Sequence, residues 1–107
     1  MRWASVAEQD LTQIVDYIAM DSVKNAIAVF RKIRDEVNSL STFPARCRVV
    51  PELQAVGIDF YRELILRPYR IIFRSEEESV FVVGVFNGRR NLEDVLLERL
   101  IRYRIER

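Results

Sequence analysis

Arginine is the residue type that carries the candidate chemistry in the second half of this chain. A guanidinium group binds phosphate or carboxylate oxygens, often through two hydrogen bonds at once. In a regular register, residues 70 and 74 share one face of a sheet because they differ by an even number, and we expect residue 62 to join them. Two adjacent arginines, Arg89 and Arg90, also follow shortly after the apolar run from Val80 to Phe86. The sequence therefore predicts a surface that binds an acidic partner or another target through Arg62, Arg70, Arg74, Arg89 and Arg90.

Two less specific interpretations of these arginines stay open. Arg89 and Arg90 could pair with Glu63, Glu76 or Glu93 and hold a following helix in place. Surface ion pairs of that kind are common and contribute at most about 1 kcal/mol. The arginines of the two strands could equally form a solvated face of the sheet.

Composition excludes several kinds of catalytic site. The 107 residues include no histidine, which removes Ser-His-Asp, Cys-His and histidine-held metal chemistry, so no metal and no cofactor are expected. The single cysteine, Cys47, cannot form an internal disulfide, which indicates a reducing, cytoplasmic location. Its neighbours Arg46 and Arg48 could lower the pKa of the thiol, although ordinary packing is the simpler interpretation. A net charge of +1 is weak for a protein that wraps nucleic acid.

The first half of the chain has the pattern of two amphipathic helices. Ser5 and Glu8 have the spacing of a capping box, and the helix that they begin should end near Met20. A second helix capped by Asp21 or Ser22 should stop at Phe43 and Pro44. The short break between them predicts an antiparallel hairpin. The apolar stripes are Ala7, Leu11, Ile14 and Ile18 in the first helix, and Ala26, Phe30, Ile33, Val37 and Leu40 in the second.

The second half has the pattern of a small sheet. Residues 45–57 lose periodicity and are expected to be a connection. Three runs, at about 59–66, 69–74 and 80–86, are short and rich in β-branched and aromatic residues, and their brief separators predict an antiparallel meander. The third run is apolar at nearly every position, so it should be covered on both faces or central, with Gly84 at a bulge or close approach. The first four residues could add a strand beside the meander.

The whole chain, residues 1–107, is therefore expected to form a single α+β domain. Its layout is an amino-terminal antiparallel helical hairpin packed on a small, mainly antiparallel sheet. A carboxy-terminal helix should follow from Asn91, with arginines crowding its last turns. The longest apolar run has seven residues, against the ~20 needed to span a bilayer, so no membrane segment is expected.

The order of several short motifs resembles the RelE/ParE family of type II toxin-antitoxin (plasmid stabilisation) toxins, and is closer to ParE. The likeness runs from Trp3 to about Leu92 through "A..DL..I..YI", "L..FP", "R.VPEL", "YREL", "PYRIIF" and "V.GV.NGRR.L". It implies a bacterial toxin that a cognate antitoxin neutralises, with the same fold that the periodicity predicts. It also implies either a homodimer or a toxin-antitoxin hetero-oligomer.

The resemblance leaves two cellular targets open. RelE-like members are endoribonucleases that cut messenger RNA in the ribosome, whereas ParE-like members bind and poison DNA gyrase. An RNase would use Arg62, Arg70 and Arg90 as phosphate clamps, but lysine occurs only at positions 24 and 32, and Tyr103 lies too far along the third helix to be the acid. These departures favour the non-enzymatic, gyrase-binding interpretation. A degenerate member that binds its antitoxin without toxicity is a third alternative.

Overall fold

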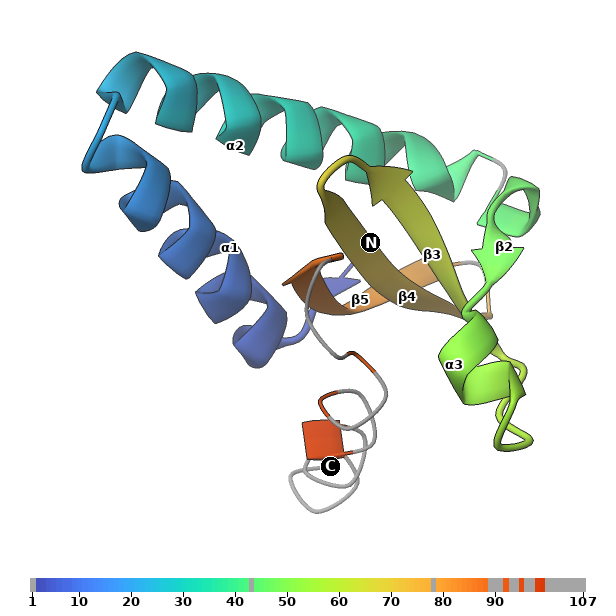
Figure 1. Ribbon diagram of the computed structural model, residues 1–107. Coiled ribbons are helices and arrows are strands. Elements are labelled where there is room, and N and C mark those ends of the chain that lie inside the picture. Colours follow the sequence, from blue (N-terminus) through green and yellow to red (C-terminus); the bar gives the residue numbers. More distant parts are fainter. Residues whose placement is uncertain are drawn as a thin grey trace.

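The computed structural model describes residues 2–42, 44–77, 79–88, 92, 95, 98 and 99. Two helices, α1 (Ser5–Ala19) and α2 (Val23–Asn38), form the predicted hairpin and meet at a tight turn at one end of the molecule (Figure 1). Two short 3-10 turns, η1 (Ser39–Ser41) and η2 (Pro44–Arg46), continue the chain after α2. The hairpin prediction is confirmed, including the end of the first helix beside Met20.

Five strands form one sheet in the order β1-β5-β4-β3-β2. The long strands β3 (Tyr61–Leu66), β4 (Tyr69–Glu76) and β5 (Ser79–Asn87) are the predicted antiparallel meander. β1 (Arg2–Trp3) adds to β5 in parallel, as the first residues of the chain allowed. The fold is therefore the predicted α+β class, with a mixed rather than wholly antiparallel sheet.

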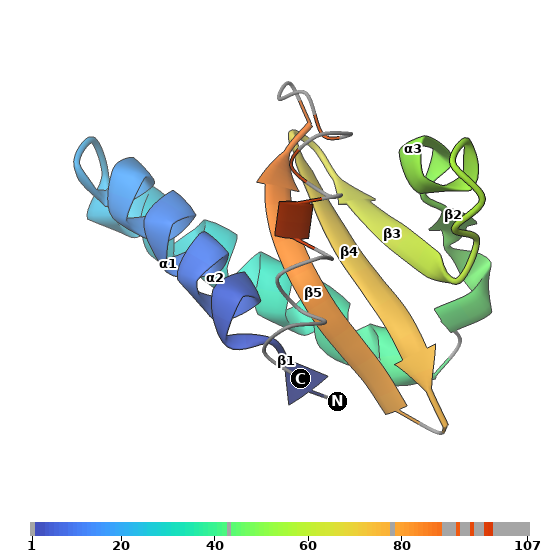
Figure 2. The ribbon, with the colours of Figure 1, turned by 90° about the horizontal axis from the view of Figure 1, so that it is seen from below.

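The segment 45–57 is more ordered than its sequence predicts. It contains β2 (Arg48–Val49), which pairs with β3, and the short helix α3 (Pro51–Gln54). Figure 2 shows both elements beside β3, at the edge of the sheet opposite β1. A two-residue strand and a four-residue helix are too short to generate a periodic pattern, and Pro51 begins α3 rather than breaking it, because proline suits the first turn of a helix.

Two predicted helix starts have different outcomes. Ser22 caps α2 as expected, because its side-chain oxygen accepts a hydrogen bond of 3.1 Å from the Asn25 amide. The prediction of a capping box at Ser5 is wrong. Ala4 is the N-cap of α1, and no side chain caps the helix. Since the Ala4 amide donates to Val82 O at 2.9 Å, the pairing of the chain with β5 sets where α1 begins.

The core lies between the helical hairpin and the sheet. Leu11 of α1, Ile33 and Val37 of α2, and Ile71 and Phe73 of β4 are all buried in it. Phe30 departs from the predicted stripe because 42% of its surface is exposed. Residues Val80–Phe86 of β5 are buried throughout, as predicted.

Gly84 has the predicted role in β5. The register with β4 shifts between Ile72, which pairs with Gly84, and Phe73, which pairs with Val82. A Cβ at Gly84 would lie 2.4 Å from Cε2 of Phe86, so the aromatic ring occupies the space of a side chain. Both a bulge and a close approach are therefore present at this residue. The predicted carboxy-terminal helix lies largely outside the described residues.

Candidate functional site

Arg70 is the centre of a cluster of four charged side chains, which we name the sheet ion cluster: Arg48, Glu52, Glu63 and Arg70. Its Nε donates to Oε1 of Glu63 at 2.5 Å, and its Nη1 and Nη2 donate to the two carboxylate oxygens of Glu52 at 2.6 and 2.7 Å. Arg48 Nε donates to the other oxygen of Glu63 at 2.6 Å. Each nitrogen of the Arg70 guanidinium thus faces a carboxylate.

Strand pairing explains how the cluster assembles. Arg48 of β2 pairs directly with Glu63 of β3, and paired residues of an antiparallel ladder point to the same side. Arg70 lies diagonally across β4 on that same face, because it pairs with Ile65, two residues from Glu63. Glu52 comes from the first turn of α3. The missed helix therefore supplies the carboxylate that Arg70 binds through two nitrogens.

Two of the side chains in the sheet ion cluster are buried, and this strengthens the attraction between their charges. The Glu63 side chain is fully buried, and the Arg70 side chain is only 12% exposed. The hydrogen bonds from Arg70 hold the pKa of Glu52 below its ordinary value, and the carboxylates of Glu52 and Glu63 raise the pKa of Arg70. Both side chains are therefore charged at neutral pH, and the positive charge of Arg70 is already compensated within the fold.

Arg62 and Arg74 do not join this cluster. Arg74 pairs with Tyr61 and Arg62 pairs with Phe73, so the two arginines point to opposite faces of the sheet. The expectation that Arg62 shares a face with Arg70 and Arg74 is wrong, because the regular register places an even-numbered residue of β3 beside an odd-numbered residue of β4. Arg62 Nη1 donates to Cys47 O at 2.6 Å.

Arg74 belongs to a second charged group at the far end of the meander. Its Nε donates to Glu76 Oε1 at 2.8 Å, and Arg2 also pairs with Glu76. The guanidinium carbons of Arg2 and Arg74 lie 5.0 and 5.5 Å from the ring centroid of Phe81. Arg89 and Arg90 lie outside the described residues. Glu63 and Glu76, which were two of their expected partners, are bound by other arginines.

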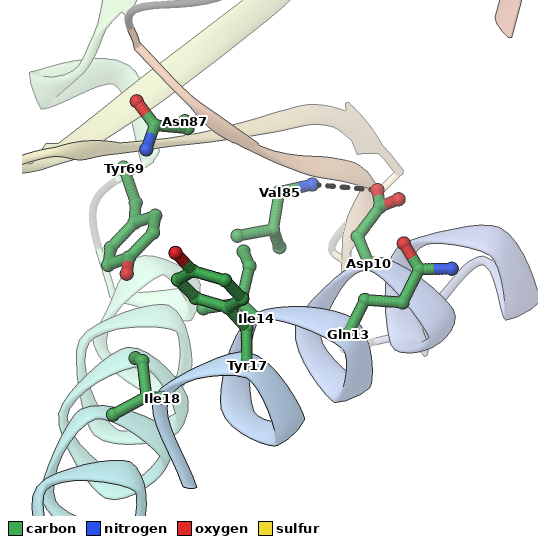
Figure 3. Close-up of a pocket in the computed structure, with 8 residues that line it drawn as sticks. All are labelled: Asp10, Gln13, Ile14, Tyr17, Ile18, Tyr69, Val85 and Asn87. Carbon is green, nitrogen blue, oxygen red and sulfur yellow. Dashed lines mark hydrogen bonds between the residues drawn. The ribbon is translucent and has the colours of Figure 1, made fainter. Parts of the chain in front are cut away.

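A groove lies between α1 and the open end of the β4-β5 hairpin, where β4 begins and β5 ends, and we name it the end groove. Its volume is about 590 Å³, and Figure 3 shows Tyr17 and Tyr69 facing each other across it. The Val85 amide donates to Asp10 Oδ2 at 3.1 Å, which joins the helix to the strand. Asn87 lies at the rim of the groove, two residues before Arg89. The lining residues are Asp10, Gln13, Ile14, Tyr17, Ile18, Tyr69, Val85 and Asn87.

Sequence reasoning missed the end groove and the role of Asp10. The groove residues come from segments that are far apart in the sequence, residues 10–18 and 69–87, and the α1 residues look like an ordinary amphipathic helix. The Cys47 thiol is buried, and that burial raises its pKa, so the alternative of a lowered pKa is wrong. Among the described residues, no cluster of histidine, cysteine and carboxylate side chains could hold a metal ion. In the same part of the chain, no helix combines the length and apolarity that a membrane span requires.

A solved chain titled "Chromosomal ParDE TA system from P. aeruginosa" has a similar fold. The two chains superpose with a TM-score of 0.63 at 20% sequence identity, over 80% of this chain and 91% of that one. Comparison with curated proteins gives no match.

The family model described as the ParE toxin of the type II toxin-antitoxin system, parDE, matches residues 1–92. The chain belongs to this family. It is therefore a ParE-like toxin of a type II toxin-antitoxin module, as the order of the sequence motifs indicated.

Proposed function

We propose that this toxin stops growth by binding DNA gyrase, without chemistry of its own, and that a cognate antitoxin neutralises it in the cytoplasm. The observation that carries the proposal is the compensation of Arg70. A phosphate clamp needs cationic donors that are free to receive the substrate. The Arg70 donors are directed at Glu52 and Glu63, at distances of 2.5–2.7 Å.

The ribosome-dependent endoribonuclease is the competing function, and the geometry counts against it. Its three proposed phosphate clamps were Arg62, Arg70 and Arg90. Arg62 and Arg70 point to opposite faces of the sheet, so they cannot clamp one phosphate together. The sequence also has no histidine to move the proton that phosphoryl transfer requires. Binding to a macromolecular target needs neither group.

The end groove is evidence for a contact surface near the end of β5. Arg89 and Arg90 come directly after this part of the chain. The groove has an apolar floor from Ile14, Ile18 and Val85, with polar groups at its rim. Concave apolar surfaces with a polar rim are the usual form of binding sites. We infer that this end of the molecule, with Arg89 and Arg90, contacts the antitoxin or gyrase. Toxin and antitoxin would then form a hetero-oligomer.

One induced culture distinguishes the two functions. Plasmid supercoiling by gyrase is measured in the extract, and primer extension maps breaks in a translated message. Loss of supercoiling with an intact message is the expected result. Message cut at translated codons, with normal supercoiling, would replace the proposal with the endoribonuclease. Normal supercoiling, intact message and unchanged growth would identify a toxin that has lost its activity.

The contact surface is tested by reversing both charges, Arg89→Glu with Arg90→Glu. Antitoxin affinity and growth inhibition are measured together, with Lys32→Glu as the control, because Lys32 is an exposed cation on α2. The double variant should lose at least one of the two properties, and the control should keep both. A folded double variant that keeps both would disprove a role for this end of the molecule.

A further inference from the structure

An asparagine followed by a glycine lies where β5 ends. Asn87 is half-buried at the rim of the end groove (Figure 3), and Gly88 is exposed. Asn87 is the one asparagine of the chain that precedes glycine. Glycine has no side chain to shield its backbone nitrogen, so this nitrogen can reach the preceding asparagine side chain. The pair therefore has the chemistry of spontaneous deamidation, which is one reason why asparagine is a thermolabile residue type.

The reacting atom, the backbone nitrogen of Gly88, is held by the fold. Its N–H donates to Pro68 O at 2.7 Å, and Pro68 lies in the turn between β3 and β4. The neighbouring residue Asn87 pairs with Tyr69, the first residue of β4. An amide nitrogen must lose its proton before it attacks a carbonyl carbon, so a donated hydrogen bond protects it. This hydrogen bond lies at the end of the β4-β5 ladder, where opening costs less free energy than in the core of a sheet.

We propose that Asn87 is a site of spontaneous modification, at which deamidation begins when the hydrogen bond from Gly88 to Pro68 opens. Solvent base removes the proton from the Gly88 nitrogen, which then attacks Cγ of Asn87. A bond forms between these two atoms and closes a cyclic succinimide, while the bond from Cγ to Nδ2 breaks and ammonia leaves with a proton from solvent. Water then opens the ring at either carbonyl and gives aspartate or isoaspartate.

Either product places a carboxylate where the groove now has a neutral amide. An aspartate has an ordinary pKa of about 3.9, so the new group is charged at neutral pH. It lies two residues before Arg89 and lowers the positive charge of this part of the chain. In isoaspartate the backbone also passes through the former side chain, which lengthens it by a methylene and disrupts the pairing of residue 87 with Tyr69.

The functional consequence rests on the proposed function, whereas the chemistry does not. If this end of the molecule contacts the antitoxin or gyrase, deamidation of Asn87 weakens that contact. Because the reaction is irreversible without a repair enzyme, it would inactivate the surface as the protein ages. The modification site and its consequence can therefore be tested separately.

The first test follows the folded full chain during incubation at neutral and mildly alkaline pH. Peptide mass spectrometry measures conversion of the amide at each asparagine, and enzymatic methylation detects isoaspartate. We expect conversion at Asn87 to be at least tenfold faster than at Asn38 and to rise with pH, because base removes the proton. Asn38 is the internal control, since it precedes the small residue Ser39, whose amide donates to Asp35 O at the end of α2.

Variants and unfolding assign the reaction to this pair and to its hydrogen bond. Gly88→Ala shields the nitrogen and Asn87→Gln moves the carbonyl away from it, so each should slow conversion at position 87 at least tenfold. The added Cβ of Gly88→Ala would lie 3.2 Å from Pro68 O, so Asn87→Gln serves as the variant that leaves the glycine unchanged. The chain unfolded in urea should convert at least tenfold faster than the folded chain. Asp10→Ala should also speed conversion, because it removes the acceptor of the nearby Val85 amide in β5.

Two results would overturn the modification site. One is an unchanged Asn87 in the folded chain after an incubation that converts the unfolded chain. The other is equal rates in the folded and unfolded chains, which would remove the control by the hydrogen bond.

The consequence is measured with Asn87→Asp, which carries the charge of the product, and with Asn87→Gln as its neutral control. Antitoxin affinity or growth inhibition should fall at least threefold in Asn87→Asp and stay unchanged in Asn87→Gln. If both variants retain both properties while Asn87 still converts, the modification site stands and its predicted effect on the contact surface is wrong. Binding of both variants without any gyrase inhibition by the natural chain would instead contradict the proposed function.

Discussion

Arg70 stabilises the fold through ion pairs that are almost completely removed from solvent. Replacing Arg70 by methionine keeps much of the aliphatic packing but leaves the buried carboxylate of Glu63 with Arg48 as its one ion-pair partner among the described residues. Breaking a buried pair in this way costs about 3–5 kcal/mol. We therefore expect Arg70→Met to lower the free energy of unfolding in urea by that amount.

Arg48 provides the matched control for this prediction. Its side chain is 60% exposed, so its pairing with Glu63 is partly replaced by water when it is removed. Arg48→Gln should cost at most about 1 kcal/mol. If Arg70→Met and Arg48→Gln have equal effects, the sheet ion cluster does not depend on the burial of Arg70. An Arg70→Met variant that is as stable as the natural protein would also contradict the structural role.

Glu52 gives the sheet ion cluster a dependence on pH. The Arg70 hydrogen bonds lower the folded-state pKa of Glu52 below its unfolded value of about 4.3. The resulting stabilisation is fully present above that value and is lost as the pH falls through the folded pKa. In Glu52→Gln the decrease in unfolding free energy below about pH 4.3 should be smaller than in the natural protein.

The exposed carboxylate Asp59 supplies the control for the pH experiment. Asp59→Asn should retain the acid sensitivity of the natural protein, because no ion pair to Asp59 occurs among the described residues. Urea unfolding at several pH values measures all three proteins. Parallel curves for Glu52→Gln and the natural protein would show that Glu52 is not coupled to Arg70 in solution.

At the scale of elements, the two helix starts differ in what holds them. The Ser22 side chain accepts a hydrogen bond at the start of α2, whereas α1 begins at Ser5 and its N-cap, Ala4, offers no side-chain cap. Loss of an N-cap hydrogen bond costs about 1 kcal/mol. Ser22→Ala should therefore lower the unfolding free energy by that amount, and Ser5→Ala should change it by less than about 0.5 kcal/mol. A larger effect at Ser5 would restore the capping box that its sequence suggests.

The elements with a long repeating pattern could be predicted from the sequence. The stripes through Leu11 and Ile33 predict two helices, and the β-branched runs predict three strands, because each pattern persists over several turns or residues. β2 and α3 could not be predicted, since their position depends on pairing with β3 rather than on local preference. The start of α1 at Ser5 was predicted, but the capping box was wrong for the same reason, because β1 pairs with β5 just before the helix.

The candidate site was less predictable than the fold because it depends on which segments meet. The arginines of β4 were recognised as charged strand residues, but their carboxylate partners could not be assigned without the register. Glu52 lies in a segment without periodicity, and Glu63 was expected to form an ion pair with Arg89 or Arg90. The end groove joins α1 to residues 69, 85 and 87, so no local signal could identify it.

At the scale of the whole molecule, Asp10 connects three parts of the chain. Its Oδ2 accepts from the Val85 amide of β5 at 3.1 Å and from Arg99 Nη1 at 2.7 Å, while Oδ1 accepts from Arg99 Nη2 at 3.2 Å. The Arg99 guanidinium carbon also lies 4.9 Å from the Phe86 ring centroid. One partly buried carboxylate of α1 thus binds both the edge of β5 beyond its pairing with β1 and a residue that follows the sheet.

A double-mutant cycle measures this connection. Asp10→Ala and Arg99→Gln should each destabilise the protein, and their combination should cost less than the sum, with a coupling energy of about 1–3 kcal/mol. Asp10→Ala should also speed hydrogen exchange at the Val85 amide, because it removes the acceptor. Arg99→Gln should affect that amide less, since the Asp10 carboxylate remains. Additive effects in the cycle would show that Asp10 binds β5 and Arg99 independently, and that the helical layer is not coupled to the chain beyond the sheet.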